Sequence, residues 1–240
     1  MAVYKIKFIR REEVADGTTA FHFEKPPRFE FKAGQFVEMT LLNPSEVDAE
    51  GNNRAFSIAS APYEPELMVV MRMRDTAFKR VLKTLPAGEE VQIEGPFGDF
   101  TLHNNASRPA VFLMGGIGIT PVRSIVVQAA QEKSPHKIFL FYSNRQKKDV
   151  AFFDELEKLK TKNINYVFVP TMTDVPESDT SWQGERGYIN EPMLKKYLGD
   201  LQGNIYYSAG PPAMVAAMRK ILNGVGVDDD DIRTEEFSGY

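Results

Sequence analysis

The sequence has no cysteine among its 240 residues. This excludes disulfides, thiolate zinc sites, a cysteine nucleophile and a cysteine-ligated iron–sulfur cluster within the chain. Only three histidines are present, His22, His103 and His136, and they lie far apart in the sequence, so we expect no metal site. No apolar run approaches the roughly 18 residues of a transmembrane helix, and the first residues do not resemble a signal peptide. We therefore expect a cytoplasmic protein without a membrane span.

An excess of positive charge is also missing. The chain has 29 Lys and Arg against 33 Asp and Glu, a net charge of -4, which makes nucleic acid an unlikely partner. Its hydrophobic content of 42% and charged content of 26% are ordinary for a globular protein with a buried core. The length fits two domains of common size.

The first part of the chain, to about Phe100, consists of short alternating or β-branched runs separated by turn residues. This pattern predicts a small antiparallel Greek-key β-barrel. One helix is expected in this part, from Phe78 to Leu85, with Thr76 as its N-cap. The strands are expected in YKIKFI, TAFHF, QFVEMTLL, RAFSIAS, LMVVMRM and VQIEG.

Beyond the polar, turn-rich segment 102–109, apolar strands alternate with amphipathic helices. This order predicts a Rossmann-like, doubly wound parallel α/β domain. We therefore expect domains at 1–104 and 105–240. The helices are expected at Pro121 to Glu132, Val150 to Leu159 and Pro212 to Leu222.

Two glycine-containing turns follow strands of the second domain. The first is Gly115-Gly116-Ile117-Gly118-Ile119-Thr120-Pro121, and the second is Ser208-Ala209-Gly210-Pro211-Pro212. Glycines before a helix let a phosphate approach the free N–H groups of the first helical turn, so this pair predicts a dinucleotide site. The alternative for each turn is a tight connection that binds nothing.

In the first domain, the segment 54–60 contains a cation, an aromatic and a hydroxyl, Arg54, Phe56 and Ser57, which we expect on one face of a strand. These residues can bind a phosphate, pack on an aromatic group and hydrogen-bond a flavin ring nitrogen. The alternative is an ordinary half-exposed strand.

The segment from Arg72 to Lys79 ends a strand and begins a helix. Arg74, Thr76 and the backbone N–H groups of Ala77 and Phe78 predict an anion site there. The alternative is a capped helix beside solvated arginines. The next turn, GPFGDF at 95–100, is either an exposed aromatic turn or a loop against a cofactor.

Seven segments, RAFSIAS, DTAFK, GPFGDF, GGIGITP, FYSNR, SAGPP and EEFSGY, resemble in content and order the ferredoxin–NADP reductase superfamily. The resemblance covers essentially the whole chain. It implies a six-stranded barrel that binds FAD and an α/β domain that binds NAD(P), with hydride passing from the nicotinamide to the flavin.

The resemblance also implies the roles of individual residues. Ser57 is expected to hydrogen-bond flavin N5, Glu235 to be the family's acidic residue and Phe237 to stack on the isoalloxazine; these three are the candidate catalytic residues. Tyr240 is expected to pack on another part of the cofactor. The candidate cofactor-binding residues are Arg54, Ala55, Phe56, Ser57, Ile58, Arg72, Arg74, Thr76, Ala77, Phe78, Gly115, Gly116, Gly118, Thr120, Pro121, Ser143, Arg145, Gly210, Pro211, Phe237 and Tyr240.

Three departures from the family pattern limit how far the family's residue roles apply to this chain. Ala209 stands where many members have a cysteine near the reacting nicotinamide carbon, which suggests altered hydride transfer. The pyrophosphate segment reads Asp-Thr-Ala-Phe-Lys rather than Gly-x-x-Ser, so FMN is an alternative to FAD. The chain has no cysteine-rich ferredoxin domain, so the electron acceptor is expected to be a separate protein or a free small molecule.

The choice between NADPH and NADH depends on Ser143, Asn144 and Arg145, where the adenosine ribose is expected. Arg145, with Lys147 or Lys148, can bind a 2′-phosphate and favour NADPH. The same arginine can stack on adenine without contacting a phosphate. No acidic residue stands at that strand end in the sequence, which disfavours strict selection of NADH.

We therefore expect a flavin-dependent NAD(P)H reductase that passes electrons to a ferredoxin-like or oxygenase electron-transfer protein. A basic face for this acceptor is expected at Lys5, Lys7, Arg10, Arg11 and Lys83. One alternative is a reductase of free flavin. The other is a non-catalytic module that binds flavin and dinucleotide for sensing or docking.

Overall fold

The computed structural model describes residues 2–237, and the chain divides into two compact units. The first unit contains the residues up to 101 together with 120–128, and the second contains 102–119 together with the residues from 129 onward. The sequence predicts a single division between residues 104 and 105, which places 120–128 in the second domain. This division stays a prediction. Each unit is described by itself below.

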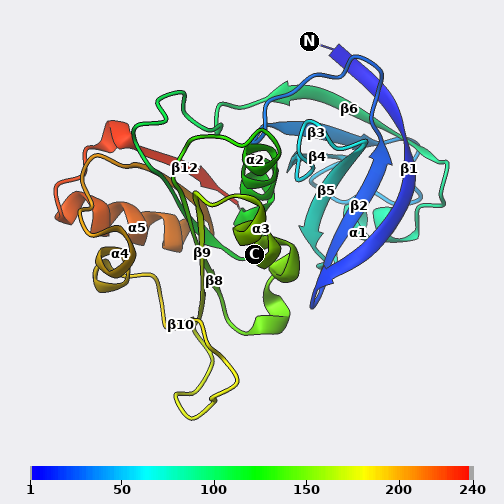
Figure 1. Ribbon diagram of the computed structural model, residues 1–240. Helices are drawn as coiled ribbons and strands as arrows, with labels where there is room; N and C mark the ends of the chain where they lie inside the picture. The colour runs from blue at the N-terminus through cyan, green and yellow to red at the C-terminus, as the bar shows by residue number, and fades with distance from the viewer. Residues whose placement is uncertain (1, 238–240) are drawn as a thin grey trace. The chain divides into compact units, whose positions relative to one another are not determined.

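The first unit is a six-stranded antiparallel sheet in the order β4-β3-β6-β1-β2-β5, which confirms the predicted antiparallel fold (Figure 1). The long strand β1 pairs with β6 over residues 2–7 and with β2 from residue 8 onward, so one strand belongs to both halves of the sheet. The elements are β1 (Ala2–Ala15), β2 (Thr18–Glu24), β3 (Phe36–Leu41), β4 (Asn53–Ser57), β5 (Glu66–Arg72), α1 (Ala77–Thr84) and β6 (Glu90–Phe97).

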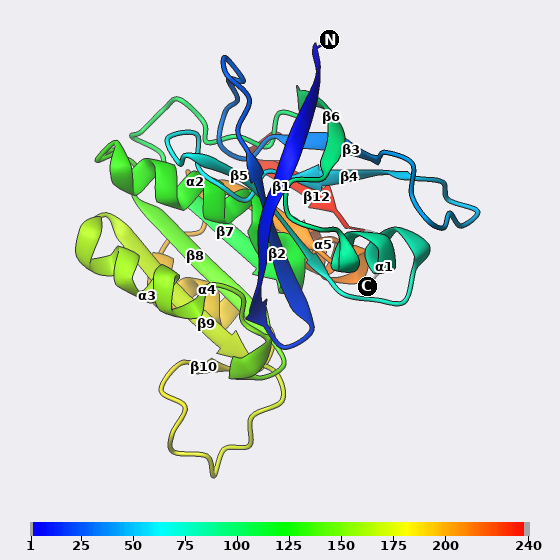
Figure 2. The ribbon, with the colours of Figure 1, turned by 90° about the vertical axis from the view of Figure 1, so that its right-hand side faces the viewer.

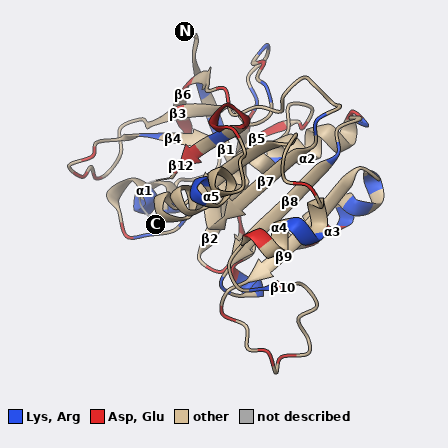
Figure 3. Ribbon diagram, turned by 90° about the vertical axis from the view of Figure 1, so that its left-hand side faces the viewer, with Lys and Arg blue, Asp and Glu red and all other residues tan. Residues whose placement is uncertain are grey.

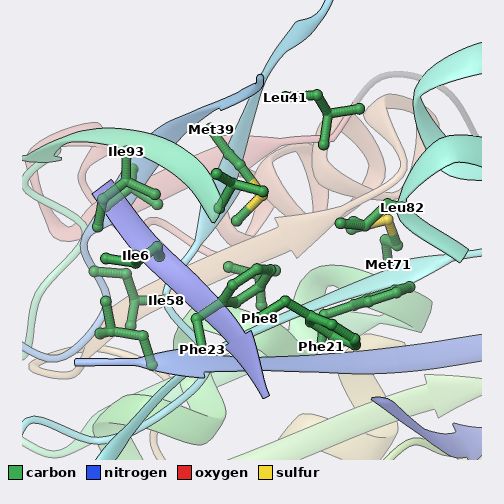
Figure 4. Packing of buried hydrophobic residues seen from close by; sticks show 14 of the residues in the cluster. Ile6, Phe8, Phe21, Phe23, Met39, Leu41, Ile58, Met71, Leu82 and Ile93 are labelled. Carbon is green, nitrogen blue, oxygen red and sulfur yellow. The ribbon is translucent and has the colours of Figure 1, made fainter. Parts of the chain in front are cut away.

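The core of this unit lies between the two halves of the sheet and is rich in phenylalanine. Phe8 packs against Phe21 and Phe23 with ring centroids 6.2 and 5.6 Å apart, and Met39 and Ile93 come from the other half (Figure 4). Alternation along each strand delivers these side chains to one face. The core therefore anchors β4 and α1, which carry the candidate flavin residues.

The second unit contains a six-stranded, fully parallel sheet in the order β10-β9-β8-β7-β11-β12, which confirms the predicted doubly wound domain. The strand order reverses between β7 and β11, and open α/β sheets bind ligands beyond the carboxyl ends of the strands at such a point. The strands are β7 (Ala110–Gly115), β8 (Ile138–Asn144), β9 (Tyr166–Met172), β10 (Glu185–Arg186), β11 (Ile205–Gly210) and β12 (Ile232–Glu236).

Helices cover both faces of this sheet: α3 lies on one face, and α4 and α5 lie on the other (Figure 2). The helix expected at residues 150–159 begins three residues later, after a 3-10 turn at Lys147–Asp149, and α4 was not expected. The helices are α2 (Ile119–Gln131), α3 (Phe153–Lys162), α4 (Glu191–Leu198) and α5 (Pro212–Gly224). Within residues 2–237, no helix has the length and apolar character needed to cross a membrane.

Helix α2 begins in the second unit, and its residues 120–128 belong to the first. Within the first unit, the buried Arg123 donates to the Ala59 carbonyl at 2.8 Å and to both carboxylate oxygens of Glu64 at 2.9 and 3.1 Å. Ser124 Oγ donates to the Ser60 carbonyl at 2.7 Å. Two side chains of α2 thus fix the loop that follows β4.

Candidate functional site

The flavin candidates of the first unit gather where β4 lies beside the start of α1. The rings of Phe56 and Phe78 are 5.7 Å apart, and the Arg54 guanidinium lies 5.4 Å from the centroid of the Phe78 ring. Thr76 is the N-cap of α1 and accepts a hydrogen bond from the Lys79 N–H, as expected for a capping threonine. The structure therefore brings a cation, two aromatic rings and a helix N-terminus together.

Lys79 adds a third positive charge to Arg54 and Arg74 near this point. Burial, and then the charges of Arg74 and Arg54, lower the pKa of Lys79 from its ordinary value. Its ammonium group donates to the Arg72 carbonyl at 2.8 Å. These three cations concentrate positive charge beside the N-terminus of α1 on a protein whose net charge is negative. Lys79 was not among the binding residues expected from the sequence.

An acidic side chain lies in this same surface. Asp48, from the loop between β3 and β4, accepts from Arg54 Nη2 at 3.1 Å and from the Ala77 N–H at 3.2 Å. Glu50 also pairs with Arg54, at 2.9 Å. Two groups expected to bind a phosphate, the Arg54 guanidinium and the Ala77 N–H, are therefore already paired with carboxylates of this chain.

Ser57 is the last residue of β4, and it is buried. Its hydroxyl has no hydrogen-bond partner among residues 2–237. Because successive residues of a strand point to opposite faces, Ser57 does not share the face of Arg54 and Phe56, and the expectation of one common face was wrong. An orphaned buried hydroxyl at a strand end fits a hydrogen bond to a flavin ring nitrogen.

The neighbouring candidates divide into two kinds. The Ile58 side chain is 1% exposed and belongs to the hydrophobic core, so only its backbone can face a cofactor. Ala77 and Phe78 are likewise buried, and their N–H groups are what they can offer a ligand. Ala55, Arg72 and Arg74 are exposed.

In the second unit, the two glycine-containing turns meet at the switch point between β7 and β11. A Cβ on Gly118 would lie 2.2 Å from the Ala209 carbonyl oxygen, and one on Gly210 would lie 3.1 Å from the Gly115 oxygen. The glycines thus permit close approach of two backbones, which is a structural reason for them besides ligand binding. The two turns lie together as the sequence predicted, with Pro211 as the residue before α5.

Tyr142 on β8, which the sequence analysis did not single out, also holds the first turn. Its hydroxyl donates to the Gly116 carbonyl at 2.9 Å, and Gly116 has a φ of 50°. Thr120 and Pro121 follow in the first turn of α2, and Thr120 is buried. The tyrosine was hard to recognise because it lies inside an apolar strand and has no local signal of its own.

The end of β8, where the sequence predicted the adenosine ribose, has an acidic residue nearby. Ser143 pairs in register with Gly115 of β7, and Arg145, just beyond β8, is exposed. The Asp174 carboxylate, from the loop after β9, accepts from Gln146 Nε2 at 3.0 Å, and the Asp174 N–H donates to the Arg145 carbonyl at 2.9 Å. An acidic residue from the loop after β9 therefore lies near the end of β8, although none directly follows β8 in the sequence.

The candidates near the end of the chain lie beside the second glycine turn. Glu235 pairs in register with Ala209, and the Phe237 N–H donates to the Gly210 carbonyl at 3.2 Å. Both side chains are partly exposed. Tyr240 lies outside the described residues.

Two of the five cations expected to form a basic face for an acceptor, Lys5 and Arg10, are paired with acidic side chains. Arg10 pairs with Glu12 and Glu66 at 3.2 and 3.1 Å, and Lys5 lies 3.9 Å from Glu90. Arg11 donates to backbone carbonyls at the end of α1. These arginines are engaged in structural contacts, which weakens the expectation of a docking face. No cluster of three or more potential ligands within residues 2–237 could hold a metal ion.

Comparison with known proteins adds independent findings. Residues 112–220 match the family model for the oxidoreductase NAD-binding domain. Curated relatives include a subunit of the Na(+)-translocating NADH-quinone reductase from Serratia proteamaculans, 28% identical over 97% of this chain and 60% of the relative. The corresponding subunit from Histophilus somni is 32% identical over 78% of this chain and 49% of the relative. The chain thus spans about half to three fifths of the length of these relatives.

Solved structures share the fold of both units. The Amycolatopsis cytochrome P450 reductase GcoB aligns with a TM-score of 0.82 at 23% identity, over 98% of this chain and 70% of that one. A ferredoxin NADP+ reductase from Neisseria gonorrhoeae, whose structure contains bound FAD and NADP, aligns with a TM-score of 0.79 at 21% identity, over 98% of both chains. Residues 112–220 thus match the oxidoreductase NAD-binding domain, and the chain has the fold of the ferredoxin NADP+ reductase structure.

Proposed function

We propose that this protein is a flavoprotein reductase that binds FAD in its first unit, takes hydride from NADH, and passes electrons to a separate one-electron acceptor protein. The flavin, when bound, supplies the redox chemistry, accepting a hydride and releasing single electrons. The observation that carries the proposal is the buried Ser57 hydroxyl without a partner among the described residues, on a strand that also presents Arg54 and Phe56.

The residues of this chain contribute binding and orientation. Arg54, Arg74 and Lys79 supply positive charge for the flavin phosphates, and the Ala77 and Phe78 N–H groups supply donors at the helix start. Ser57 orients the reacting edge of the flavin ring through its hydroxyl. In the second unit, the turns containing Gly116 and Gly210, whose φ values are 50° and 151°, would bind the dinucleotide through their backbone N–H groups.

The preference for NADH over NADPH rests on Asp174. A carboxylate beside Arg145 can accept a hydrogen bond from a ribose 2′-hydroxyl, and it repels a 2′-phosphate. Asp149, which accepts from the Gln146 N–H at 3.0 Å, adds a second negative charge nearby. The names of the curated relatives, which are NADH-quinone reductase subunits, support the same preference.

An anaerobic titration of the flavin-loaded protein with NADH and then NADPH tests the proposal. We expect NADH to bleach the visible flavin spectrum at lower concentration than NADPH. Substitution Asp174→Asn is expected to reduce the preference for NADH over NADPH about tenfold. The reason is that it removes the repulsion between the Asp174 carboxylate and the 2′-phosphate of NADPH. The matched control is Asp154→Asn, which removes an equal charge from the exposed first turn of α3 and is expected to leave the preference unchanged. Failure of both nucleotides to bleach a bound flavin would refute the reductase function.

A further inference from the structure

The loop between β3 and β4, residues 42–52, carries three carboxylates that each contact a cation next to the flavin candidates. Glu46 pairs with Arg80 of α1 at 2.6 Å, Glu50 pairs with Arg54, and Asp48 lies between them in the sequence. Figure 3 draws this loop with its acidic residues in red. The acidic side chains at every second position from 46 to 50 thus contact Arg54 of β4 and Arg80 of α1.

Asp48 makes the contacts that a phosphate would make there. One of its oxygens accepts from the Arg54 guanidinium at 3.1 Å, and the other accepts from the Ala77 N–H, the first of α1, at 3.2 Å. A flavin phosphate needs the same two donors, a guanidinium and a helix-start N–H group. The two donors cannot make these hydrogen bonds to the Asp48 carboxylate and to a phosphate at the same time.

The carboxylate of Asp48 is ionised at neutral pH. Burial opposes ionisation, but hydrogen bonds from the Glu50 N–H and from Arg54 outweigh it and hold the pKa of Asp48 below its ordinary value. Arg54 also donates to the carbonyls of Glu50, Gly51 and Asn53 at 2.9, 3.1 and 2.7 Å. The loop therefore occupies the guanidinium with the carboxylates of Asp48 and Glu50 and with backbone oxygens.

The loop is held in a way that permits release. The Glu50 side chain is 75% exposed, and both members of the Glu46–Arg80 pair are at least 40% exposed. Ion pairs this exposed to water contribute little to stability and are screened by salt. A ligand that offers two negative charges to Arg54 and α1, on the phosphate of FMN or on the pyrophosphate of FAD, can therefore replace Asp48.

We propose that Asp48 is an internal competitor for the flavin phosphates: it fills the phosphate position at the start of α1, and phosphate-bearing flavins bind only by displacing it. This inference rests on the proposed function, since it assumes that the flavin binds at β4 and α1. It assigns the loop 42–52 the role of setting flavin affinity. A consequence is that the flavin exchanges with free flavin more readily than the cations of the site would otherwise allow.

The test compares the affinity of apoprotein for FAD, FMN and riboflavin, measured by quenching of flavin fluorescence, in the wild type and in Asp48→Asn. If the competing state makes up about nine tenths of the unliganded protein, its removal tightens FAD and FMN about tenfold. Riboflavin has no phosphate, so its affinity is expected to stay unchanged. Glu30→Gln, which removes an exposed carboxylate between β2 and β3, is the charge-matched control and is expected to change none of the three.

Unchanged or weakened binding of FAD and FMN in Asp48→Asn would overturn the inference while leaving flavin binding itself intact. A second measurement needs no flavin: thermal protection by inorganic pyrophosphate is expected to be larger in Asp48→Asn, and in a second variant, Asp48→Ser, than in the wild type. Equal protection in all three proteins would overturn the inference. Absence of flavin binding in every protein would instead refute the proposed function, and the pyrophosphate result would still decide the role of Asp48.

Discussion

Ser57 is a costly residue for the protein to bury, because a hydroxyl without a partner loses its hydrogen bonds to water on folding. A ligand that supplies a partner recovers this loss, so such a group is retained where a ligand uses it. We expect Ser57→Ala to slow flavin reduction by NADH about 10- to 100-fold, because one oriented hydrogen bond to the reacting ring is lost.

Rapid mixing of NADH with the flavin-loaded variant measures this rate. Removal of an unpaired hydroxyl is expected to leave the melting temperature equal or slightly higher, so stability provides the internal control. Ser57→Thr, which keeps the hydroxyl, is expected to restore part of the rate. A reduction rate in Ser57→Ala equal to that of the wild type would remove Ser57 from the reaction.

Gly118 allows a backbone approach that no side chain would permit. An added Cβ would lie 2.2 Å from the Ala209 carbonyl oxygen and 2.8 Å from the Gly210 nitrogen, both backbone atoms that cannot rotate away. We expect Gly118→Ala to destabilise the protein by about 2 kcal/mol, within the range for overpacked sites.

Urea unfolding measures the loss of stability in Gly118→Ala. The control is Gly224→Ala at the end of α5, where an added Cβ meets nothing within 4 Å and φ is not positive. That substitution is expected to be neutral or mildly stabilising. Equal stability of the two variants would mean that the turns after β7 and β11 separate more easily than their geometry implies.

At this scale, the sequence predicted those site residues whose roles depend on local backbone. The glycine turns and the Thr76 cap depend on neighbours in the chain, so a short motif is sufficient to identify them. Asp48 and Asp174 reach their partners Ala77 and Gln146 from 29 and 28 residues away, and no local pattern marks either carboxylate. The position of Ser57 was predicted, but its face was not, because one residue of register exchanges the two faces of a strand.

At the scale of elements, α2 depends on an ion pair that is mostly buried. Arg123 is 6% exposed and binds Glu64, whose pKa is lowered: burial raises it, but the hydrogen bond and charge of Arg123 prevail. Because the folded-state pKa lies below the ordinary 4.5, this pair stabilises the protein fully above about pH 4.5. The stabilisation is lost as the pH falls through the lower, folded-state value.

We expect Glu64→Gln to cost about 3 kcal/mol at neutral pH, since Arg123 is left buried without a counter-charge. The cost is expected to shrink as the pH falls below 4.5. Denaturant unfolding at several pH values measures both effects. Glu90→Gln is the control: its pair with Lys5 is exposed, and we expect a change within about 0.5 kcal/mol. A pH-independent cost would contradict the ionic role of Glu64.

Two elements departed from expectation, and only one of them, α4, is marked by the sequence. Helix α4 has two start signals, Asn190 as a cap that accepts from the Met193 N–H and Pro192 in the first turn, but it is only eight residues long and follows a long polar loop. Helix α3 begins after Phe152, whose positive φ of 62° no propensity predicts for a phenylalanine. The parallel, doubly wound sheet followed from the alternation of strands and helices.

For the whole molecule, the net charge of -4 governs encounters with charged acceptor proteins. Because Arg10 and Arg11 are engaged in internal contacts, we expect no strong attraction for an acidic ferredoxin. NADH-driven reduction of a basic acceptor such as cytochrome c is expected to slow at least about twofold between low and physiological salt, whereas reduction of ferredoxin is expected not to slow.

Steady-state assays over a range of ionic strength measure these dependences. The rate of flavin reduction by NADH alone serves as the control, since it involves no acceptor protein. If salt instead slowed the reduction of ferredoxin, the chain would present a local basic face, and substitution of Lys7 and Lys83 would locate it.

The assignment of residues 120–128 to the first unit bears on how this protein can be divided. A fragment that ends at residue 104 would retain Glu64 and the Ser60 carbonyl but lose Arg123 and Ser124, the side chains that satisfy them. Such a fragment would leave the Glu64 carboxylate without its arginine and the loop after β4 without two of its hydrogen-bond donors. A gene fusion or laboratory chimaera that exchanges one unit of this protein therefore has to supply α2 to each unit. The junction cannot be placed in a linker alone, because one helix belongs to both units.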